Sequence, residues 1–258
     1  MNYKVDFHTH SYYSDGLLKP TELVKMYKEK GYDLIALTDH DGVAGVSEAM
    51  IAGEALEMQI VPGIEFGCGY DFGEDRVELH ILGYHIDIEN EKLLTYIKKA
   101  RDAREVRNEK LLAHLNDLGF ELSREDLITR PKQDYIGKPD FARALRRKGI
   151  AHDHMWEIFD QVEKEKISVY EAIEVIREAG GIAVLAHPMK IKKIGIADEP
   201  EFWDNLDIIV RDLKKHGLKG MECYHPSADH EQALKLVVMA GKYHLHITEG
   251  SDFHGDEA

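Results

Sequence analysis

The sequence predicts an α/β fold in which seven mainly parallel strands close, or nearly close, into a barrel that a helical insertion interrupts. Short apolar stretches alternate with amphipathic stretches in both the first and the last part of the chain. The apolar stretches are almost continuous, which is typical of parallel strands buried on both faces. Roughly residues 92–166 lack a comparable strand pattern. The 258 residues are therefore expected to form one large domain that carries an insertion.

The first part of the chain is predicted to consist of repeated strand–helix units. One helix is expected to begin at Pro20 and Thr21 and to end at Gly31, because proline favours the first helical turn and glycine the position after the last. The expected strands are 4–7, 33–37, 59–65 and 76–84, and the expected helices are 20–30 and 46–58.

The last part repeats this pattern. Ser168 and Glu171 form a capping box at the start of a helix, which Gly180 and Gly181 end. The expected strands are 182–186, 220–224 and 244–248, and the expected helices are 168–179, 205–216 and 229–242. Seven such strands favour a closed or nearly closed barrel over an open sheet.

The middle of the chain is predicted to be a helical cap. Leucines and isoleucines recur at helical spacing from Leu93 to Leu118, before Gly119, and further helices are expected at 139–148 and 153–164. The segment is rich in Arg and Lys, most of which we expect to be solvated, with a few that neutralise phosphate. The predicted division is 1–91 and 167–258 for the barrel and 92–166 for the cap.

Composition narrows the possible functions. The formal net charge of −15 argues against a broad basic surface for nucleic acid. No apolar run approaches the roughly 18 residues of a membrane span, and no signal-peptide pattern is seen. The two cysteines, Cys68 and Cys223, are too far apart in sequence for a metal-binding pair, so free thiols in a reducing cytoplasm are expected.

The first chemical motif follows the first predicted strand. Side chains of a strand alternate between its faces, so His8 and His10 project to the same side, about 6–7 Å apart along the strand. Two imidazoles so placed can chelate zinc, manganese or iron. Asp15 follows in a Ser-Asp-Gly turn and can extend the site toward a second ion.

Further histidines and carboxylates lie at or near the ends of the other predicted strands. In a parallel barrel these ends share one face, which carries the active site, so residues far apart in sequence should converge there. The candidates are His8, His10, Asp15, His40, Glu65, His80, His187, His225, Asp252 and His254. Asp39, next to His40, is expected to orient that ligand rather than to bind metal.

Six or seven imidazoles and three carboxylates exceed the needs of one tetrahedral zinc ion. Two or three divalent ions are implied, with at least one bridging carboxylate. Such clusters lower the pKa of a bound water and clamp the attacking and leaving oxygens of an in-line displacement at phosphorus. Hydrolysis of a phosphate ester is therefore the leading prediction.

The motifs H-T-H…S-D-G, T-D-H, G-I-E, A-H-P and G-S-D-F-H resemble those of the polymerase and histidinol phosphatase (PHP) superfamily. The resemblance implies a distorted (β/α)7 TIM-like barrel with a trinuclear metal centre, of manganese, iron or zinc. It also implies a bridging hydroxide as nucleophile, with Glu65 and Asp252 acting in catalysis through the metals. The implied ligands are His8, His10, Glu65 and Asp252 for one ion; Glu65, His80 and His187 for the second; and Asp15, His40 and His254 for the third.

The cap motif from Tyr135 to Leu145 and the preceding R-x-x-R-x-x-R helix resemble PHP phosphoesterases that remove the 3′-phosphate from nucleoside 3′,5′-bisphosphates. Relatives of that group degrade short RNA from the 5′ end. The resemblance implies a small phosphorylated substrate, a nucleotide or short oligonucleotide. The candidate phosphate contacts are Lys138, Arg143, Lys190 and His225. Lysine stands at 138 and 190 where arginine is usual, which keeps the charge but loses the bidentate fork.

Three other functions remain open. A histidinol-phosphate-type phosphatase shares the ligand motifs but lacks the cap motif from Tyr135 to Leu145. A metal-dependent amidohydrolase also begins with H-x-H but lacks the set formed by Asp15, His40 and His254. A non-catalytic metal-binding module that assists a polymerase would be expected to have lost ligands. The sequence predicts no oligomeric state.

Overall fold

A computed structural model describes residues 3–129, 133, 135–150, 154–162, 165 and 167–255. Its strands are β1 (Val5–Thr9), β2 (Leu34–Leu37), β3 (Gln59–Phe72), β4 (Asp75–Tyr84), β5 (Ile167–Ser168), β6 (Ile182–Leu185), β7 (Gly220–Tyr224) and β8 (His246–Glu249). They pair in the order β1-β2-β3-β4-β6-β7-β8, with β5 added beside β3. The prediction of a barrel-like α/β fold is confirmed.

The barrel is nearly closed by contacts between its first and last strands. Thr9 and Phe253 form an isolated parallel bridge. The backbone N–H of His10 donates to the Phe253 carbonyl at 2.9 Å, and the Phe253 N–H donates to the His8 carbonyl at 3.3 Å. These bonds place the end of the described chain beside the first metal-type motif.

The direction of β4 departs from the simple expectation of parallel strands. β3 does not end at Glu65 but continues to Phe72, and β4 returns antiparallel to it with Phe72 opposite Asp75. Only Gly73 and Glu74 separate the two strands, and so short a connection permits only an antiparallel hairpin. Glu65 therefore lies inside a strand rather than at its end, and that part of the prediction is wrong, whereas His80 lies within its strand as expected.

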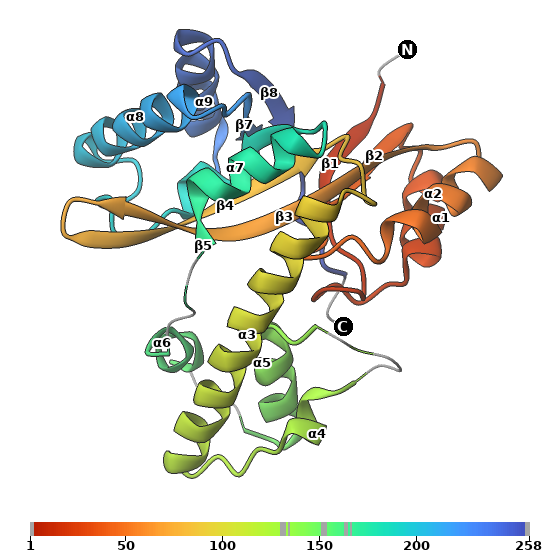
Figure 1. Ribbon diagram of the computed structural model, residues 1–258, viewed down its shortest axis with the longest axis vertical. Helices are drawn as coiled ribbons and strands as arrows, with labels where there is room; N and C mark the ends of the chain where they lie inside the picture. Colours follow the sequence, from red (N-terminus) through yellow and green to blue (C-terminus); the bar gives the residue numbers. More distant parts are fainter. Residues whose placement is uncertain are drawn as a thin grey trace.

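Helices cover the outside of the barrel (Figure 1). They are α1 (Pro20–Glu29), α2 (Val46–Ala55), α7 (Val169–Glu178), α8 (Pro200–Lys215) and α9 (His230–Lys242). Their apolar faces form two clusters with the strands, one around Ile35 and Leu37 and one around Ile64 and Leu185. Within the described residues, no helix is both long enough and apolar enough to cross a membrane.

The alternation of side chains along the strands divides the barrel interior. Val61 and Leu82 belong to an apolar cluster with Val184. Because side chains repeat their direction every second residue, Glu65 shares a face with Val61, and His80 shares one with Leu82. The same strands therefore supply an apolar plug and, two or four residues away, polar ligands.

The cap is built on one long helix, α3 (Glu91–Asp117), which runs out of the barrel (Figure 1). Leu93 and Ile97 pack in the barrel core, whereas Leu111 and Leu115 pack in a separate cap core with Phe141. The other cap helices are α4 (Arg124–Leu127), α5 (Lys138–Arg147) and α6 (Met155–Asp160). The ends of the helix expected at 153–164 include residues outside the described part of the chain.

Candidate metal centre

Glu65 lies at the centre of the candidate site and is completely buried. Its two carboxylate oxygens are approached by histidines from several elements. Its Oε2 lies 3.2 Å from His8 Nε2, 3.3 Å from His10 Nε2 and 3.1 Å from His40 Nδ1. Its Oε1 lies 2.8 Å from His80 Nδ1 and 3.1 Å from His187 Nε2. A carboxylate placed in this way can bridge two ions.

The first group of potential ligands is His8, His10, Glu65 and Asp252, the set implied by the family resemblance for one ion. Its ligand atoms all lie within 4.8 Å of one another. Asp252 Oδ1 is 3.4 Å from His8 Nε2 and 3.2 Å from His10 Nε2. One ion could be bound by β1, β3 and the segment after β8.

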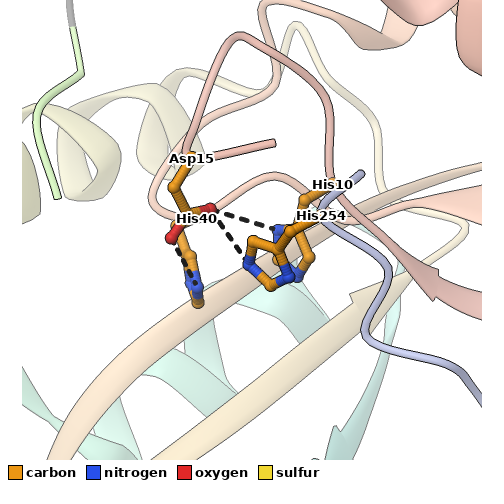
Figure 2. Close-up of side chains that lie close together, drawn as sticks. All are labelled: His10, Asp15, His40 and His254. Carbon is orange, nitrogen blue, oxygen red and sulfur yellow. Dashed lines mark ion pairs between the residues drawn. The ribbon is translucent and has the colours of Figure 1, made fainter. Parts of the chain in front are cut away.

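The second group is His10, Asp15, His40 and His254, whose side chains point toward one another (Figure 2). The Asp15 carboxylate lies 3.2 Å from His254 Nε2, 3.7 Å from His40 Nε2 and 3.9 Å from His10 Nδ1. The implied set did not include His10, which belongs to both of these groups.

A third group combines His40, Glu65 and His80. His187, expected with Glu65 and His80, lies beside them, with its ring centroid 5.0 Å from that of His80. The structure thus brings the predicted ligands into one cluster, although they divide among groups differently from the expectation. His40 faces both Glu65 and Asp15.

Several ligand atoms in this cluster are buried without a hydrogen-bond partner. They include His8 Nε2, His10 Nε2, His40 Nδ1 and Glu65 Oε2. Their close approaches lack hydrogen-bond geometry, and a buried polar atom without a partner costs about 1–3 kcal/mol. A divalent cation between them would satisfy these nitrogen and oxygen donors at once, so the residues present fit metal ions.

The pKa shifts within the cluster also indicate that it favours positive charge between its carboxylates. Burial lowers the pKa of His10, but Asp252 and Glu65 outweigh it and raise that pKa to about 10. Burial is likewise outweighed at His80, where Glu65 raises the pKa to about 10. Burial would raise the pKa of Glu65, yet the surrounding histidines hold it well below its ordinary value. Metal ions can replace these protons as the positive charge between the carboxylates.

Hydrogen bonds fix which nitrogen of two histidines faces the cluster. His8 Nδ1 lies 3.1 Å from the carboxylate of Glu222, and His254 Nδ1 donates to the backbone carbonyl of Asp252 at 2.7 Å. In each ring Nε2 then keeps its lone pair for a metal. Glu222 also accepts the backbone N–H of His187 at 2.8 Å.

Glu222 was not among the residues expected from the sequence, because it is a buried carboxylate inside β7 rather than at a strand end. Asp6 was not expected either, although it accepts from the backbone N–H groups of His8 and Ser251 at 3.0 Å. Asp6, His8 and His10 are spaced by two residues, a signal that could have identified Asp6. Both carboxylates position ligands.

Asp39, expected to orient the adjacent His40, bonds instead to the loop between His10 and Asp15. Its carboxylate accepts from the Ser11 backbone N–H, the Ser11 hydroxyl and the Ser14 hydroxyl, each at 2.7 Å. These bonds hold the loop between His10 and Asp15. Gly16 is required there, because a Cβ atom would lie 2.4 Å from the His10 carbonyl oxygen.

Two candidate ligands adopt backbone conformations that non-glycine residues rarely take. His187 has φ of 27° and Asp252 has φ of 55°. Such conformations cost about 1–3 kcal/mol and persist where the surroundings enforce them, often at functional sites. The Glu222 contact to the His187 N–H is one such constraint.

The candidate substrate contacts have different surroundings. Lys190 lies 2.6 Å from Asp252, and His225 Nε2 is 3.7 Å from the same carboxylate. Arg143 donates two hydrogen bonds to the backbone carbonyl of Asp15. Lys138 is paired with Asp160 inside the cap at 2.6 Å.

Comparison with known proteins identifies related sequences over almost the whole chain. The PHP domain family matches residues 6–165. A 5′-3′ exoribonuclease from Haemophilus influenzae is 30% identical over 98% of this chain and 91% of its own. A phosphoribosyl 1,2-cyclic phosphate 1,2-diphosphodiesterase from Eggerthella lenta is 29% identical, covering 97% and 94%. A 3′,5′-nucleoside bisphosphate phosphatase from Chromobacterium violaceum is 28% identical, covering 97% and 87%.

The fold is shared with a solved structure. A Bifidobacterium adolescentis protein, described as an inferred metal-dependent phosphoesterase, superposes with a TM-score of 0.85 at 26% identity. The match covers 100% of this chain and 90% of that protein. The similarity therefore includes both the barrel and the cap.

Proposed function

The chain belongs to the PHP domain family and is a metal-dependent phosphoesterase, and we propose that it removes the 3′-phosphate from nucleoside 3′,5′-bisphosphates. Short oligoribonucleotides, hydrolysed from the 5′ end, are proposed as further substrates. The convergence of His8, His10, Glu65 and Asp252 in one group with unpaired ligand atoms supports the metal-dependent chemistry. The similarity to a 3′,5′-nucleoside bisphosphate phosphatase supports the proposed substrate.

We propose two or three divalent ions, of manganese, iron or zinc, held by the nine ligands expected from the sequence. When bound, such ions lower the pKa of water and neutralise charge on the phosphoryl group. Glu65 touches ligands of every group, so its role would be to hold neighbouring ions at a fixed separation. Glu222 and Asp6 would hold His8, and Asp39 would hold the loop of Asp15.

His225 is suited to contact a phosphate oxygen. Its Nδ1 accepts the backbone N–H of Ser227 at 2.9 Å, so in the neutral ring the proton is on Nε2. Nε2 has no hydrogen-bond partner and lies 3.7 Å from Asp252 Oδ2. A protonated Nε2 is a hydrogen-bond donor rather than a metal ligand, which supports a role in substrate binding.

The position of the cap favours a small substrate over a long polymer. Tyr135 of the cap stacks on the His40 ring, with centroids 6.3 Å apart and planes 10° apart, and Arg143 reaches the Asp15 loop. The cap therefore covers one side of the metal cluster. The acidic net charge is unfavourable for a long nucleic acid, so we propose nucleotides or the ends of short chains.

The proposal is tested by phosphate release with Mn²⁺ from adenosine 3′,5′-bisphosphate, compared with 3′-AMP, 5′-AMP, histidinol phosphate and phosphoribosyl 1,2-cyclic phosphate. Release from the bisphosphate should exceed release from either monophosphate. The His187→Ala variant should lose the activity while keeping its fold. Preference for histidinol phosphate, or turnover of the cyclic diester alone, would overturn the proposed substrate but not the phosphoesterase class.

Short RNA with a 5′-phosphate is a separate arm of the same test. Stepwise shortening from the 5′ end, visible on a sequencing gel with 3′-labelled RNA, is the expected result. Attack in the middle of the chain would contradict the proposed direction. A 5′-hydroxyl RNA of the same sequence is the control for a requirement for the terminal phosphate.

A further inference from the structure

The cap contacts the second ligand group from more than one direction. Arg143 of α5 donates through Nη2 and Nη1 to the Asp15 carbonyl at 2.7 Å and 3.3 Å. Arg104 of α3 pairs with Asp41, the residue after His40. The Tyr135 ring stacks on His40 and lies 4.5 Å from the Arg104 guanidinium.

The Asp15 loop is held from the barrel side by a separate set of bonds. Asp39 binds the hydroxyls of Ser11 and Ser14, and the Gly16 N–H donates to the Ser11 carbonyl at 3.1 Å. These contacts fix the base of the loop. The orientation of the Asp15 peptide, and with it the carboxylate, also depends on the bonds that its carbonyl accepts from Arg143.

Arg143 is itself held in place within the cap. Asp140, completely buried and one turn earlier on α5, lies 3.9 Å from Arg143 Nη2. The other oxygen of Asp140 accepts the backbone N–H of Gly137 at 2.9 Å, at the start of the same helix. Both Nη atoms of Arg143 thus point at a carbonyl oxygen rather than at open space for a phosphate.

We propose that Arg143 is a positioning residue that couples docking of the cap to metal binding by His10, Asp15, His40 and His254. The inference rests on the proposed metal-dependent function. Arg143 holds the Asp15 carbonyl so that the Asp15 carboxylate faces His254 and His40. Coupling is reciprocal, so an ion bound by this group also stabilises the docked cap.

The experiment is a Mn²⁺ titration of Arg143→Met, followed by electron paramagnetic resonance and elemental analysis without substrate. One of the ions should bind about 10- to 100-fold more weakly, the usual effect of removing a residue that orients a ligand. Arg143→Lys should recover part of the affinity, because an ammonium can still donate to the carbonyl. In turnover, kcat should fall at limiting Mn²⁺ and recover at high Mn²⁺, with KM little changed.

Arg147→Met is the matched control. Arg147 is one turn further along α5 and also donates to a backbone carbonyl, but that carbonyl belongs to Asp126 within the cap. Its removal perturbs the same helix without touching the Asp15 loop. Metal affinity should therefore stay at the level of the unmodified protein.

Two results would overturn the proposal. One is unchanged metal affinity in Arg143→Met with an increased KM, which would make Arg143 a substrate contact instead. The other is equal loss of metal affinity in Arg143→Met and Arg147→Met, which would show a general effect of disturbing the cap. Metal affinity is measured without substrate, so failure of the proposed function is distinguished from failure of this inference.

A second measurement covers the case in which Arg143→Met does not fold. Hydrogen exchange of α5 in the unmodified protein should slow when Mn²⁺ is added, because the ion and the docked cap stabilise each other. Exchange of α9, on the far side of the barrel, serves as the internal reference. Equal changes in α5 and α9 would contradict the coupling.

Discussion

The barrel mouth and the cap use charge in different ways. In the mouth, ligand atoms of His8, His10 and Glu65 converge without hydrogen-bond partners. In the cap, many of the basic side chains that suggested phosphate binding are paired within the protein, as Lys138 is with Asp160 and Arg124 with Glu105. Unpaired ligand atoms indicate the chemistry of the site, whereas paired surface cations say little about the substrate.

Not every basic side chain of the cap is fully paired, and Arg107 is one example. Its side chain is buried, and neither Nε nor Nη2 has a hydrogen-bond partner. Burial, followed by the neighbouring Arg104, lowers its pKa to about 10, so it remains charged at neutral pH. Arg107, like Arg143 with its buried and unpaired Nε, therefore resembles the ligand atoms of the barrel mouth more than the paired cations of the cap do.

The largest effect is expected from Glu65→Gln. The substitution removes the negative charge that the ligand groups share, so metal content and phosphatase activity should both be lost. The loss of metal affinity should exceed the roughly 10- to 100-fold loss that follows removal of a residue that only orients a ligand. Elemental analysis and phosphate release measure these. Glu171→Gln, on the exposed pair with Lys99, is the control and should retain both. Retained metal in Glu65→Gln would refute the role of this carboxylate.

A smaller effect is expected from Glu222→Gln. The amide can accept only one of the two bonds that now orient His8 and His187, so metal affinity should fall by about 10- to 100-fold while some activity remains. Titration with Mn²⁺ under chelator competition measures the change. An effect as large as that of Glu65→Gln would mean that Glu222 binds metal directly.

Arg107→Met should affect substrate binding rather than metal. A substrate phosphate that accepted from the unpaired Nε or Nη2 of Arg107 would gain about 1.5–3 kcal/mol, so without this side chain KM for adenosine 3′,5′-bisphosphate should rise by about 10-fold or more. Lys138→Met is the comparison, and its paired ammonium predicts a change below about 3-fold. Steady-state kinetics on both variants measures the two changes in KM. A larger increase in KM for Lys138→Met than for Arg107→Met would show that pairing in the cap does not predict which cations contact substrate.

The smallest effect concerns stability against pH without metal. The pKa of His10 and His80 is raised from 6.5 to about 10, so their stabilising contribution is complete below pH 6.5 and lost as pH rises toward 10. The lowered pKa of Glu65 gives a contribution complete above 4.5 and lost in acid. Burial lowers the pKa of His40 to about 3 and also lowers that of His187, so their contribution is complete only above pH 6.5 and is lost in acid. Thermal unfolding with chelator should therefore show the cluster's contribution greatest near pH 6.5, and added Mn²⁺ should remove the alkaline loss. A flat profile between pH 6.5 and 10 would contradict this.

Local sequence patterns determined the order of strands and helices and the identity of the candidate ligands. Turn residues, period-2 alternation and helical spacing act over a few residues, so they can be read along the chain. His8, His40 and Asp252 could be selected because each follows a predicted strand. The inward direction of the ligands on β3 and β4 also follows from alternation, although the antiparallel return of β4 was not expected.

Tertiary structure alone decided which groups meet across the fold. Glu222 acts on His8, 214 residues away, and Arg143 acts on Asp15, 128 residues away. No local pattern distinguishes an arginine that binds a backbone carbonyl from one that binds phosphate. The sequence determined the residue types available for metal chemistry, because ligand type and strand position are local properties. The closure of the barrel and the docking of the cap decided their partners, because hydrogen bonds and burial depend on distances between remote segments.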